Sequence, residues 1–137
     1  MPYAGFAILL ASTVLAASAQ TPQSIENTEW KLLQVGDEMV VGDAPQGEPT
    51  LTLDPEGNRA SGTGGCNRFT GGYQLDGNKI EFSPIAATRM MCPEGMDTED
   101  AFFYVLAEAR SFAMVDGHLE FYDADGERLA RFEPPSR

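Results

Sequence analysis

The stretch "SGTGGCNRFTGGY", residues 61–73, decides how the rest of the chain is interpreted. It contains five glycines, one of the two cysteines of the chain, Cys66, and a polar pair, Asn67 and Arg68. It is not a phosphate-binding loop, because it lacks the Gly-Lys-Ser/Thr ending and returns to strand-like residues from Phe69 onward. Glycines inside a strand mark bulges, sharp bends or a close approach of the backbone. The stretch therefore predicts strands that bend within a curved sheet.

Three Asp-Gly pairs lie outward from this stretch, at 76–77, 116–117 and 125–126, between segments of alternating apolar and polar residues. Asp-Gly in this setting is a strong hairpin signal, because both central residues of a type I′ turn need a positive φ. Gly- and Pro-containing turns are also predicted at 36–37 and 55–57. We expect about eight short strands, most of them antiparallel.

One segment, 96–114, follows helical spacing instead. Asp97 or Thr98 is expected to cap this helix, and Glu99 and Asp100 are expected to complement the helix dipole in its first turn. The apolar residues that recur every three or four positions are Phe102, Val105, Leu106, Ala109 and Phe112. The predicted fold is mostly β (α+β): one compact antiparallel sheet, curved or closed into a barrel, with the helix over one face or opening.

The first nineteen residues are set apart from this domain. The chain is almost wholly apolar from Ala4 to Ala17, and Ala17-Ser18-Ala19 forms a small-x-small cleavage site. This pattern predicts a signal peptide, residues 1–19. A membrane anchor that stays attached is the alternative, although the apolar run is shorter than the ~20 residues that span a bilayer.

The remaining chain divides into a polar lead-in, 20–26, a domain, 27–133, and a short tail, 134–137. No cysteine lies near the predicted cleavage site, so we expect no lipid anchor and no stable membrane anchor after cleavage. The expected product is an exported protein, periplasmic or secreted, and a monomer.

The charge of the chain excludes one large class of partners. Nine basic and twenty-one acidic residues give a formal net charge of −12. Such a surface repels nucleic acids and anionic membranes, and no cluster of Lys and Arg compensates for it. We therefore expect no nucleic-acid partner.

The two cysteines, Cys66 and Cys92, are expected to form a disulfide in an oxidising compartment. A bridge that closes a loop of about 27 residues contributes roughly 3 to 3.5 kcal/mol of stability on the chain-entropy model. A pair of reactive or buried thiols is the alternative.

Few residues form a pattern that catalysis or metal binding needs. A zinc site needs several His and Cys ligands at short spacing, whereas the chain has one histidine, His118, and two distant cysteines. A Cys66 nucleophile with His118 as base and Asn67 as orienting group is a weak alternative that a disulfide would abolish. The segment 123–127 resembles the opening of a calcium loop but lacks the later ligands. We expect no enzyme, no metal site and no cofactor.

A cluster of acidic residues near the start of the predicted helix offers one weak site for a surface cation. Its members are Glu94, Asp97, Glu99 and Asp100. Helix capping and the helix dipole already account for acids at these positions.

The order and spacing of several residues across the chain form a recognisable motif. Its members are Trp30, Leu32, Gly64, Gly65, Cys66, Asn67, Phe69, Gly71, Tyr73, Thr88, Arg89, Met90 and Cys92, followed by the helix and an apolar-acid-Gly-x-Leu strand. In this motif the chain resembles the META domain family, the family of HslJ-type heat-inducible bacterial envelope proteins. The resemblance implies a mostly antiparallel β domain, similar in topology to small lipocalin-like barrels, with one helix. It implies a link to heat response, novobiocin resistance or virulence, and no defined reaction.

Two functions remain in view from the sequence. The first is a non-enzymatic envelope protein for stress tolerance that binds a protein partner or a small molecule, with Asn67, Arg68 and Arg89 as binding candidates. Asn67 and Arg68 are expected at the surface. The second is a protease inhibitor of the small β-barrel type, with residues 20–28 or the loop 42–49 entering the enzyme cleft.

Overall fold

The computed structural model describes Gly5, residues 24–40 and residues 48–135. Within these residues, ten strands form one antiparallel sheet and one helix, α1 (Met96–Glu108), packs on it. The strands are β1 (Glu29–Val35), β2 (Glu38–Met39), β3 (Thr50–Asp54), β4 (Arg59–Thr63), β5 (Arg68–Asp76), β6 (Lys79–Phe82), β7 (Ala86–Ala87), β8 (Ser111–Val115), β9 (His118–Tyr122) and β10 (Arg128–Glu133). The predicted signal peptide, except Gly5, lies outside the described residues, as do lead-in residues 20–23, loop residues 42–47 and tail residues 136–137.

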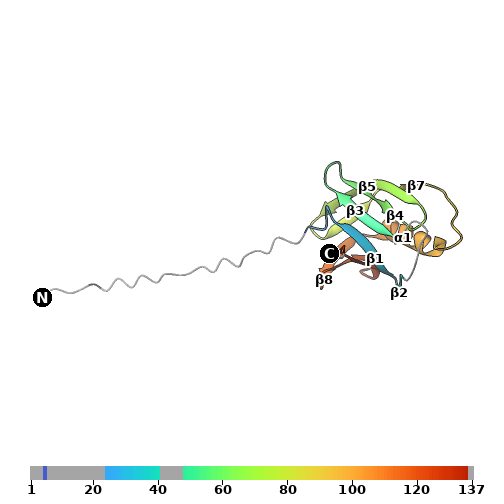
Figure 1. Cartoon of the computed structure of the whole chain (residues 1–137). Helices are drawn as coiled ribbons and strands as arrows, with labels where there is room; N and C mark the ends of the chain where they lie inside the picture. The colour runs from blue at the N-terminus through green and yellow to red at the C-terminus, as the bar shows by residue number, and fades with distance from the viewer. Residues whose placement is uncertain (1–4, 6–23, 41–47, 136–137) are drawn as a thin grey trace.

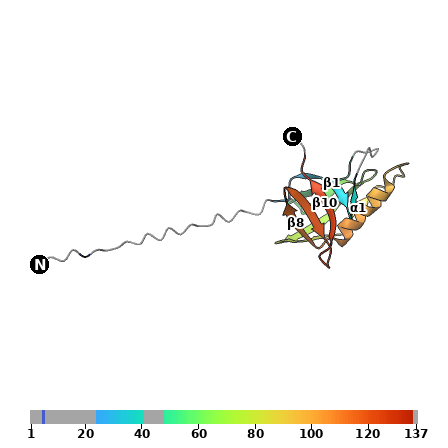
Figure 2. The same ribbon diagram turned by 90° about the horizontal axis from the view of Figure 1, so that it is seen from below.

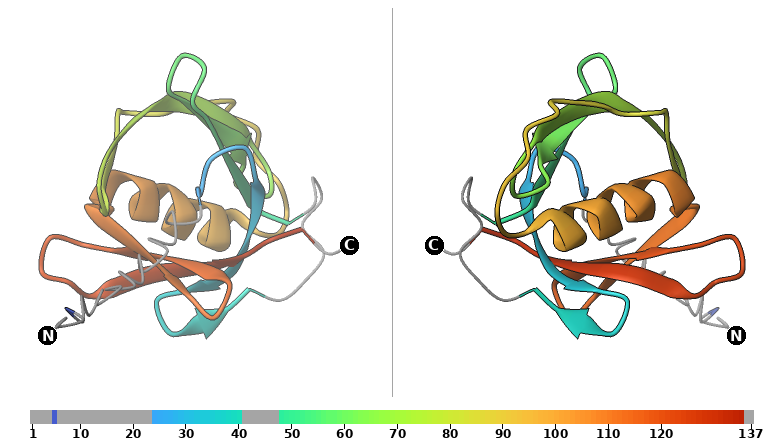
Figure 3. Two further views of the ribbon diagram at one scale, coloured as in Figure 1. Left: turned by 90° about the vertical axis from the view of Figure 1, so that its left-hand side faces the viewer. Right: turned by 90° about the vertical axis from the view of Figure 1, so that its right-hand side faces the viewer.

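The sheet curves round into a ring (Figure 3). Its strands follow the order β1, β3, β4, β5, β6, β8, β9 and β10, and β10 pairs back to β1. The two-residue strands β2 and β7 pair with β1 and β5. The join between β6 and β8 is narrow, because a single residue pair, Lys79 with Ser111, connects them. The predicted fold class, mostly β with one curved antiparallel sheet and one helix, is confirmed.

The predicted hairpins form at the Asp-Gly pairs, but their turns differ. Asp116 and Gly117 both have positive φ, 52° and 80°, and Val115 pairs with His118, as a type I′ turn requires. At the first pair, Asp76 itself pairs with Lys79, and the loop is Gly77 and Asn78. At the third pair, residues 123–127 form a longer loop between β9 and β10. The hairpin positions were predicted correctly, and the type I′ turn holds at one of the three.

The helix begins and ends differently from the prediction. Gly95, with φ of 90°, is the N-cap residue, and no side chain caps the helix, so the predicted cap at Asp97 or Thr98 is wrong. At the other end, Arg110 Nη1 donates hydrogen bonds to the carbonyls of Ala107 and Ala109, at 3.0 and 2.8 Å. Phe112, predicted on the helical stripe, lies in β8. In the described part of the chain, no helix has the length and apolar character needed to cross a membrane.

Helix α1 covers one open end of the ring (Figures 2 and 3). It contacts β1, β6 and β10, and its buried residues are Glu99, Phe102, Val105 and Leu106. Aromatic rings fill the interior beneath it: Phe102 contacts Phe69 and Phe132 with ring centroids 5.6 and 5.9 Å apart. The core therefore joins the helix to both sides of the ring.

Part of the predicted lead-in belongs to this domain (Figure 1). Ile25 is buried, and its carbonyl accepts a hydrogen bond from Trp30 Nε1 at 2.8 Å. The Tyr73 hydroxyl donates a hydrogen bond to the Glu26 carboxylate. Burial is the main cause that raises the pKa of Tyr73, and the hydrogen bond to Glu26 raises it further. The described end of the segment 20–28 is thus anchored to the sheet.

Candidate functional site

A disulfide joins the glycine-rich stretch to the segment that precedes α1. The sulfur atoms of Cys66 and Cys92 lie 2.03 Å apart, in agreement with the predicted pairing. Cys66 follows β4, whereas Cys92 lies between β7 and α1. Because Cys66 is bonded to Cys92, it is not a free nucleophile for the Cys66–His118 alternative.

The side chain of Asn67 holds the same two segments together. Its Oδ1 accepts hydrogen bonds from the Met90 N–H, at 2.6 Å, and from Thr88 Oγ1, at 2.9 Å. Its Nδ2 donates to the Met90 carbonyl, at 3.0 Å, and to Glu99 Oε2, at 2.7 Å. Asn67 therefore pairs with the backbone of Met90 much as a neighbouring strand would. The expectation that Asn67 lies at the surface is wrong, since the residue is only 3% exposed.

Glu99 completes this arrangement from the first turn of α1. Its Oε1 accepts hydrogen bonds from the backbone N–H groups of Cys66, at 3.1 Å, and Asn67, at 2.5 Å. Glu99 is 2% exposed, so three N–H donors, rather than water, solvate its carboxylate. We call Asn67, Thr88, Met90 and Glu99, together with the Cys66–Cys92 bridge, the Asn67 clamp.

Gly64 is needed for Glu99 to enter the clamp. A Cβ atom at Gly64 would lie 2.5 Å from Glu99 Cγ and 2.8 Å from Glu99 Oε1, which is closer than a Cβ atom comes to a non-bonded neighbour. The glycine-rich stretch thus lets another group approach its backbone closely, as predicted, and this group is the buried carboxylate of Glu99. The acidic cluster proposed as a weak cation site is broken up, because Glu99 turns inward. Among the described residues, no group of three or more His, Cys, Asp or Glu side chains is arranged to hold a metal ion.

A pocket of about 390 Å³ lies against the clamp. Residues of the segment 85–91, with Asn67, form one wall, and Met96, Glu99, Asp100 and Phe103 of α1 form the other. We call this hollow the motif pocket, because Asn67, Thr88, Arg89 and Met90 of the motif line it. Its apolar lining includes Ile85, Ala87, Phe103 and three methionines. The clamp fixes one wall of the pocket to the other.

The other predicted residues have different surroundings. Of the three binding candidates, Arg89 lines the motif pocket, whereas the exposed Arg68 lines a separate hollow of about 820 Å³ over β1, β3, β4 and β5. Asn67 also lines the motif pocket, although it is only 3% exposed. The motif residues Trp30, Phe69 and Tyr73 are buried in the core.

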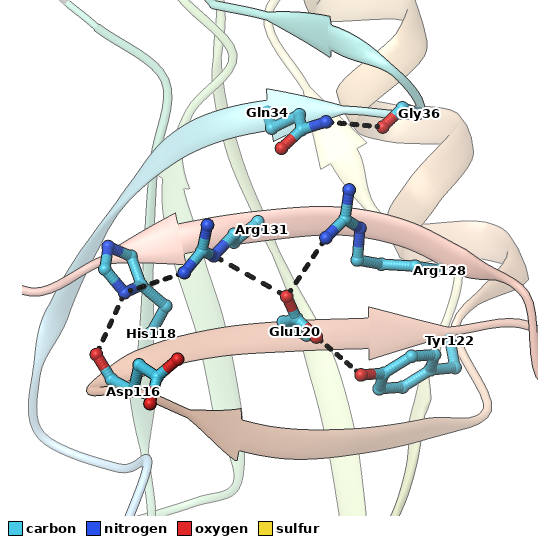
Figure 4. A network of polar contacts seen from close by, with 8 residues as sticks. All are labelled: Gln34, Gly36, Asp116, His118, Glu120, Tyr122, Arg128 and Arg131. Carbon is cyan, nitrogen blue, oxygen red and sulfur yellow. Dashed lines mark hydrogen bonds and ion pairs between the residues drawn. The ribbon is translucent and has the colours of Figure 1, made fainter.

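A second polar cluster lies on the outside of the ring, over β9 and β10 (Figure 4). Glu120, 6% exposed, is at its centre: its carboxylate accepts a hydrogen bond from the Tyr122 hydroxyl, at 2.6 Å, and pairs with Arg128 and Arg131. The bond to Glu120 is the main cause that raises the pKa of Tyr122. His118 Nδ1 lies 3.2 Å from Arg131 Nη2. We call these five residues the outer network.

The outer network connects the side chains of two neighbouring strands, β9 and β10. The Glu120 carboxylate, on β9, forms ion pairs with Arg128 and Arg131 of the neighbouring strand β10. His118 belongs to this network and to the Asp116-Gly117 turn, where its Nδ1 lies 3.1 Å from the Asp116 carbonyl. The structure therefore does not bring His118 together with Cys66 and Asn67.

A comparison with models of known protein families identifies the family of the chain. The model of the META domain matches residues 23–136. The chain belongs to the META domain family. The resemblance seen in the sequence is confirmed, and the Asn67 clamp is built largely from the residues that carried it.

Three solved structures are similar to the chain in fold. An NMR structure of a protein from Burkholderia xenovorans is 30% identical, with a TM-score of 0.63, over 82% of this chain and 85% of that one. A second NMR structure is 23% identical, with a TM-score of 0.63, over 82% of this chain and 93% of that one. A DUF4847 family protein from Bacteroides vulgatus shares the fold at 15% identity and a TM-score of 0.50, over 65% of this chain and 60% of that one. No curated protein matches the chain.

The burial of Glu99 and the helical wall of the pocket were not predicted from the sequence. The signal for Glu99 was its spacing, since it precedes Phe102 by three residues and Leu106 by seven. An acid on the apolar stripe of a helix is a candidate for burial, because that stripe faces the core. Its partners, the N–H groups of Cys66 and Asn67, lie more than thirty residues away, and spacing alone does not reveal them.

Proposed function

We propose that this META domain protein is an exported, non-enzymatic binding protein, and that a small molecule binds in the motif pocket. The observation that carries the proposal is the pocket itself: motif residues line a hollow of about 390 Å³ between two segments that the clamp holds together. This volume lies within the range of about 300–1,000 Å³ that is common for small-molecule sites. An apolar lining with a few polar groups is also typical of such sites.

The reactive groups beside the pocket support binding rather than catalysis. Cys66 is joined to Cys92, and the Glu99 carboxylate already accepts three N–H hydrogen bonds. Neither group is available as a nucleophile or a general base without the clamp breaking. The apolar leader and the disulfide support export, and the resemblance to heat-inducible envelope proteins supports a role in stress tolerance.

An amphipathic fluorescent probe, 8-anilinonaphthalene-1-sulfonate, tests the proposal on the mature, oxidised protein. We expect saturable binding, and NMR signals of Thr88, Met91 and Phe103 that shift during the titration. The variant Met91→Lys places a charge on the apolar wall and is expected to weaken binding by roughly tenfold. Met91 is 84% exposed, so this variant should remain folded.

Met39→Lys is the matched control. Met39 is also exposed, at 54%, but it lies in β2 and does not line the motif pocket. It should bind the probe as the wild type does. Equal weakening by both variants, or shifts scattered over the surface, would contradict a site in this pocket. Native mass spectrometry of protein purified from its own envelope should show a bound small molecule.

A further inference from the structure

Three of the six methionines of the chain line the motif pocket: Met90, Met91 and Met96. Two of them are exposed, Met90 at 47% and Met91 at 84%. An apolar pocket lining does not require sulfur atoms, because leucine side chains would cover the same surface. The presence of three thioether groups around one pocket therefore suggests that the sulfur atoms have a chemical role.

The backbone that carries these side chains is fixed. The Met90 N–H and carbonyl are both hydrogen-bonded to the Asn67 side chain, and Met91 precedes the bridged Cys92. Met96 is the first residue of α1. A methionine side chain has three rotatable bonds and a polarisable sulfur. All three methionines line the same hollow of about 390 Å³, and flexible thioether side chains can change rotamer to approach one bound ion.

The chemistry of the donors selects one class of ion. Thioethers are soft, neutral ligands that favour Cu(I), whereas Zn²⁺ uses thiolates, imidazoles and carboxylates. The two cysteines are consumed in the disulfide, and His118 lies in the outer network. The thioethers are then the soft donors that remain beside the pocket. Asp100 on the helical wall and a net charge of −12 favour a cation there, against the single positive charge of Arg89.

We propose that the motif pocket binds one soft monovalent metal ion, Cu(I), through the thioethers of Met90, Met91 and Met96. The inference rests on the proposed function, since it uses the same pocket, and it names an ion as a ligand of that pocket. It departs from the expectation of no metal site, which considered only His, Cys and carboxylate ligands.

Ag(I), a redox-stable analogue of Cu(I), tests the inference. Silver nitrate is added in chloride-free buffer to the mature, oxidised protein labelled with ¹³C at the methionine methyl groups. The methyl signals of Met90, Met91 and Met96 should shift together and saturate at one equivalent of Ag(I). The signals of Met39 and Met114, which do not line this pocket, should stay in place.

Two conservative variants sharpen this test. Met91→Leu keeps the apolar volume and removes one sulfur, so Ag(I) affinity should fall by roughly tenfold or more, while probe binding should persist. Met39→Leu is the matched control and should leave Ag(I) affinity unchanged. Equal shifts at Met39, no saturation, or full affinity in Met91→Leu would overturn the inference.

The two ligands separate the two proposals. If the fluorescent probe binds in the pocket and Ag(I) does not, the metal inference fails and the small-molecule proposal stands. If Ag(I) saturates the three methionines and the probe does not bind, the metal inference is supported and the small-molecule proposal fails. If neither shifts a pocket signal, both fail.

Discussion

Two buried glutamates, Glu99 and Glu120, solve the same electrostatic problem in different ways. Glu99, in the Asn67 clamp, is 2% exposed and accepts hydrogen bonds from two backbone N–H groups and an amide. Glu120, in the outer network, is 6% exposed and is surrounded by two arginines and a tyrosine hydroxyl. The Glu99 carboxylate is thus stabilised mainly by the dipoles of N–H groups, whereas the Glu120 carboxylate is stabilised mainly by the charges of two flexible arginine side chains.

This difference sets what each glutamate can do for the fold. Two of the donors to Glu99 are backbone N–H groups, those of the bridged Cys66 and of its neighbour Asn67, so they cannot turn to water if the carboxylate is lost. The side chains of Arg128 and Arg131 remain 35% and 27% exposed, so water can take over much of the solvation of their charges. The clamp should therefore cost more to break than the outer network, although the network carries more charge.

The largest effect is expected from Glu99→Ala. It leaves three buried N–H donors without an acceptor, and each such loss costs about 1–3 kcal/mol, so the free energy of unfolding should fall by about 4 kcal/mol. Urea denaturation followed by tryptophan fluorescence measures the change. Asp100→Ala, one residue further along α1 and exposed, is the control and should change stability little. A similar loss of unfolding free energy in the two variants would contradict the stabilising role of the Glu99 hydrogen bonds.

Removal of the disulfide should come next. The variant Cys66→Ser/Cys92→Ser opens a bridge with a sequence separation of 26, and the chain-entropy model gives a loss of roughly 3 to 3.5 kcal/mol. The loss should loosen the clamp and spare the outer network. Hydrogen exchange should therefore speed up more at Asn67 than at Glu120. Uniform acceleration across both regions would remove the distinction between them.

Glu120→Gln should have a smaller, salt-dependent effect. Loss of the charge should lower the free energy of unfolding by about 1.5 kcal/mol at low ionic strength. Because the arginines are partly exposed, roughly half of this effect should disappear at about 1 M salt. Denaturation at two salt concentrations measures it, with Glu99→Ala as the comparison, whose effect should not depend on salt. An equal salt dependence in the two variants would contradict this account.

The smallest effect concerns the buried tyrosine, Tyr73. Burial and the hydrogen bond to Glu26 raise its pKa above the ordinary value of 10.0. The folded protein thus holds the phenolic proton more tightly than the unfolded chain, so this contribution is complete below pH 10.0 and is lost as the pH rises above that value. Tyr73→Phe should cost about 1 kcal/mol at neutral pH and flatten this alkaline decline. Denaturation midpoints at about pH 8 and pH 11 give the comparison, and an unchanged decline would assign it to other groups.

Much of the sheet could be predicted from local sequence. The Asp-Gly pairs at 76–77, 116–117 and 125–126 lie at or beside hairpin turns, because positive φ is a local requirement that glycine meets. The closure of β10 onto β1 could not be read from the same signals. It depends on strands about one hundred residues apart, which hairpin chemistry does not connect.

The candidate site was harder to predict. The pairing of Cys66 with Cys92 was predicted from the presence of two cysteines and from the expectation that the chain is exported. Asn67 was expected at the surface because polar residues near glycines are usually exposed, and it proved to be buried by hydrogen bonds to segments more than twenty residues away. Ile25 was placed in the lead-in because its neighbours are polar, whereas its side chain packs in the core. Burial of these residues is decided by tertiary contacts, which composition does not encode.

Native-state hydrogen exchange of the backbone amides of Cys66 and Asn67 tests the Asn67 clamp most directly. If Glu99 accepts hydrogen bonds from both amides, as the structure shows, they should exchange as slowly as the amides of the buried residues Leu51 and Leu53 in β3, which pairs with β1 and β4. The amide of Gly117, in an exposed hairpin turn, should exchange fast under the same conditions. Exchange of Cys66 and Asn67 at the rate of Gly117 would contradict the clamp and, with it, the fixed pocket that the proposals require.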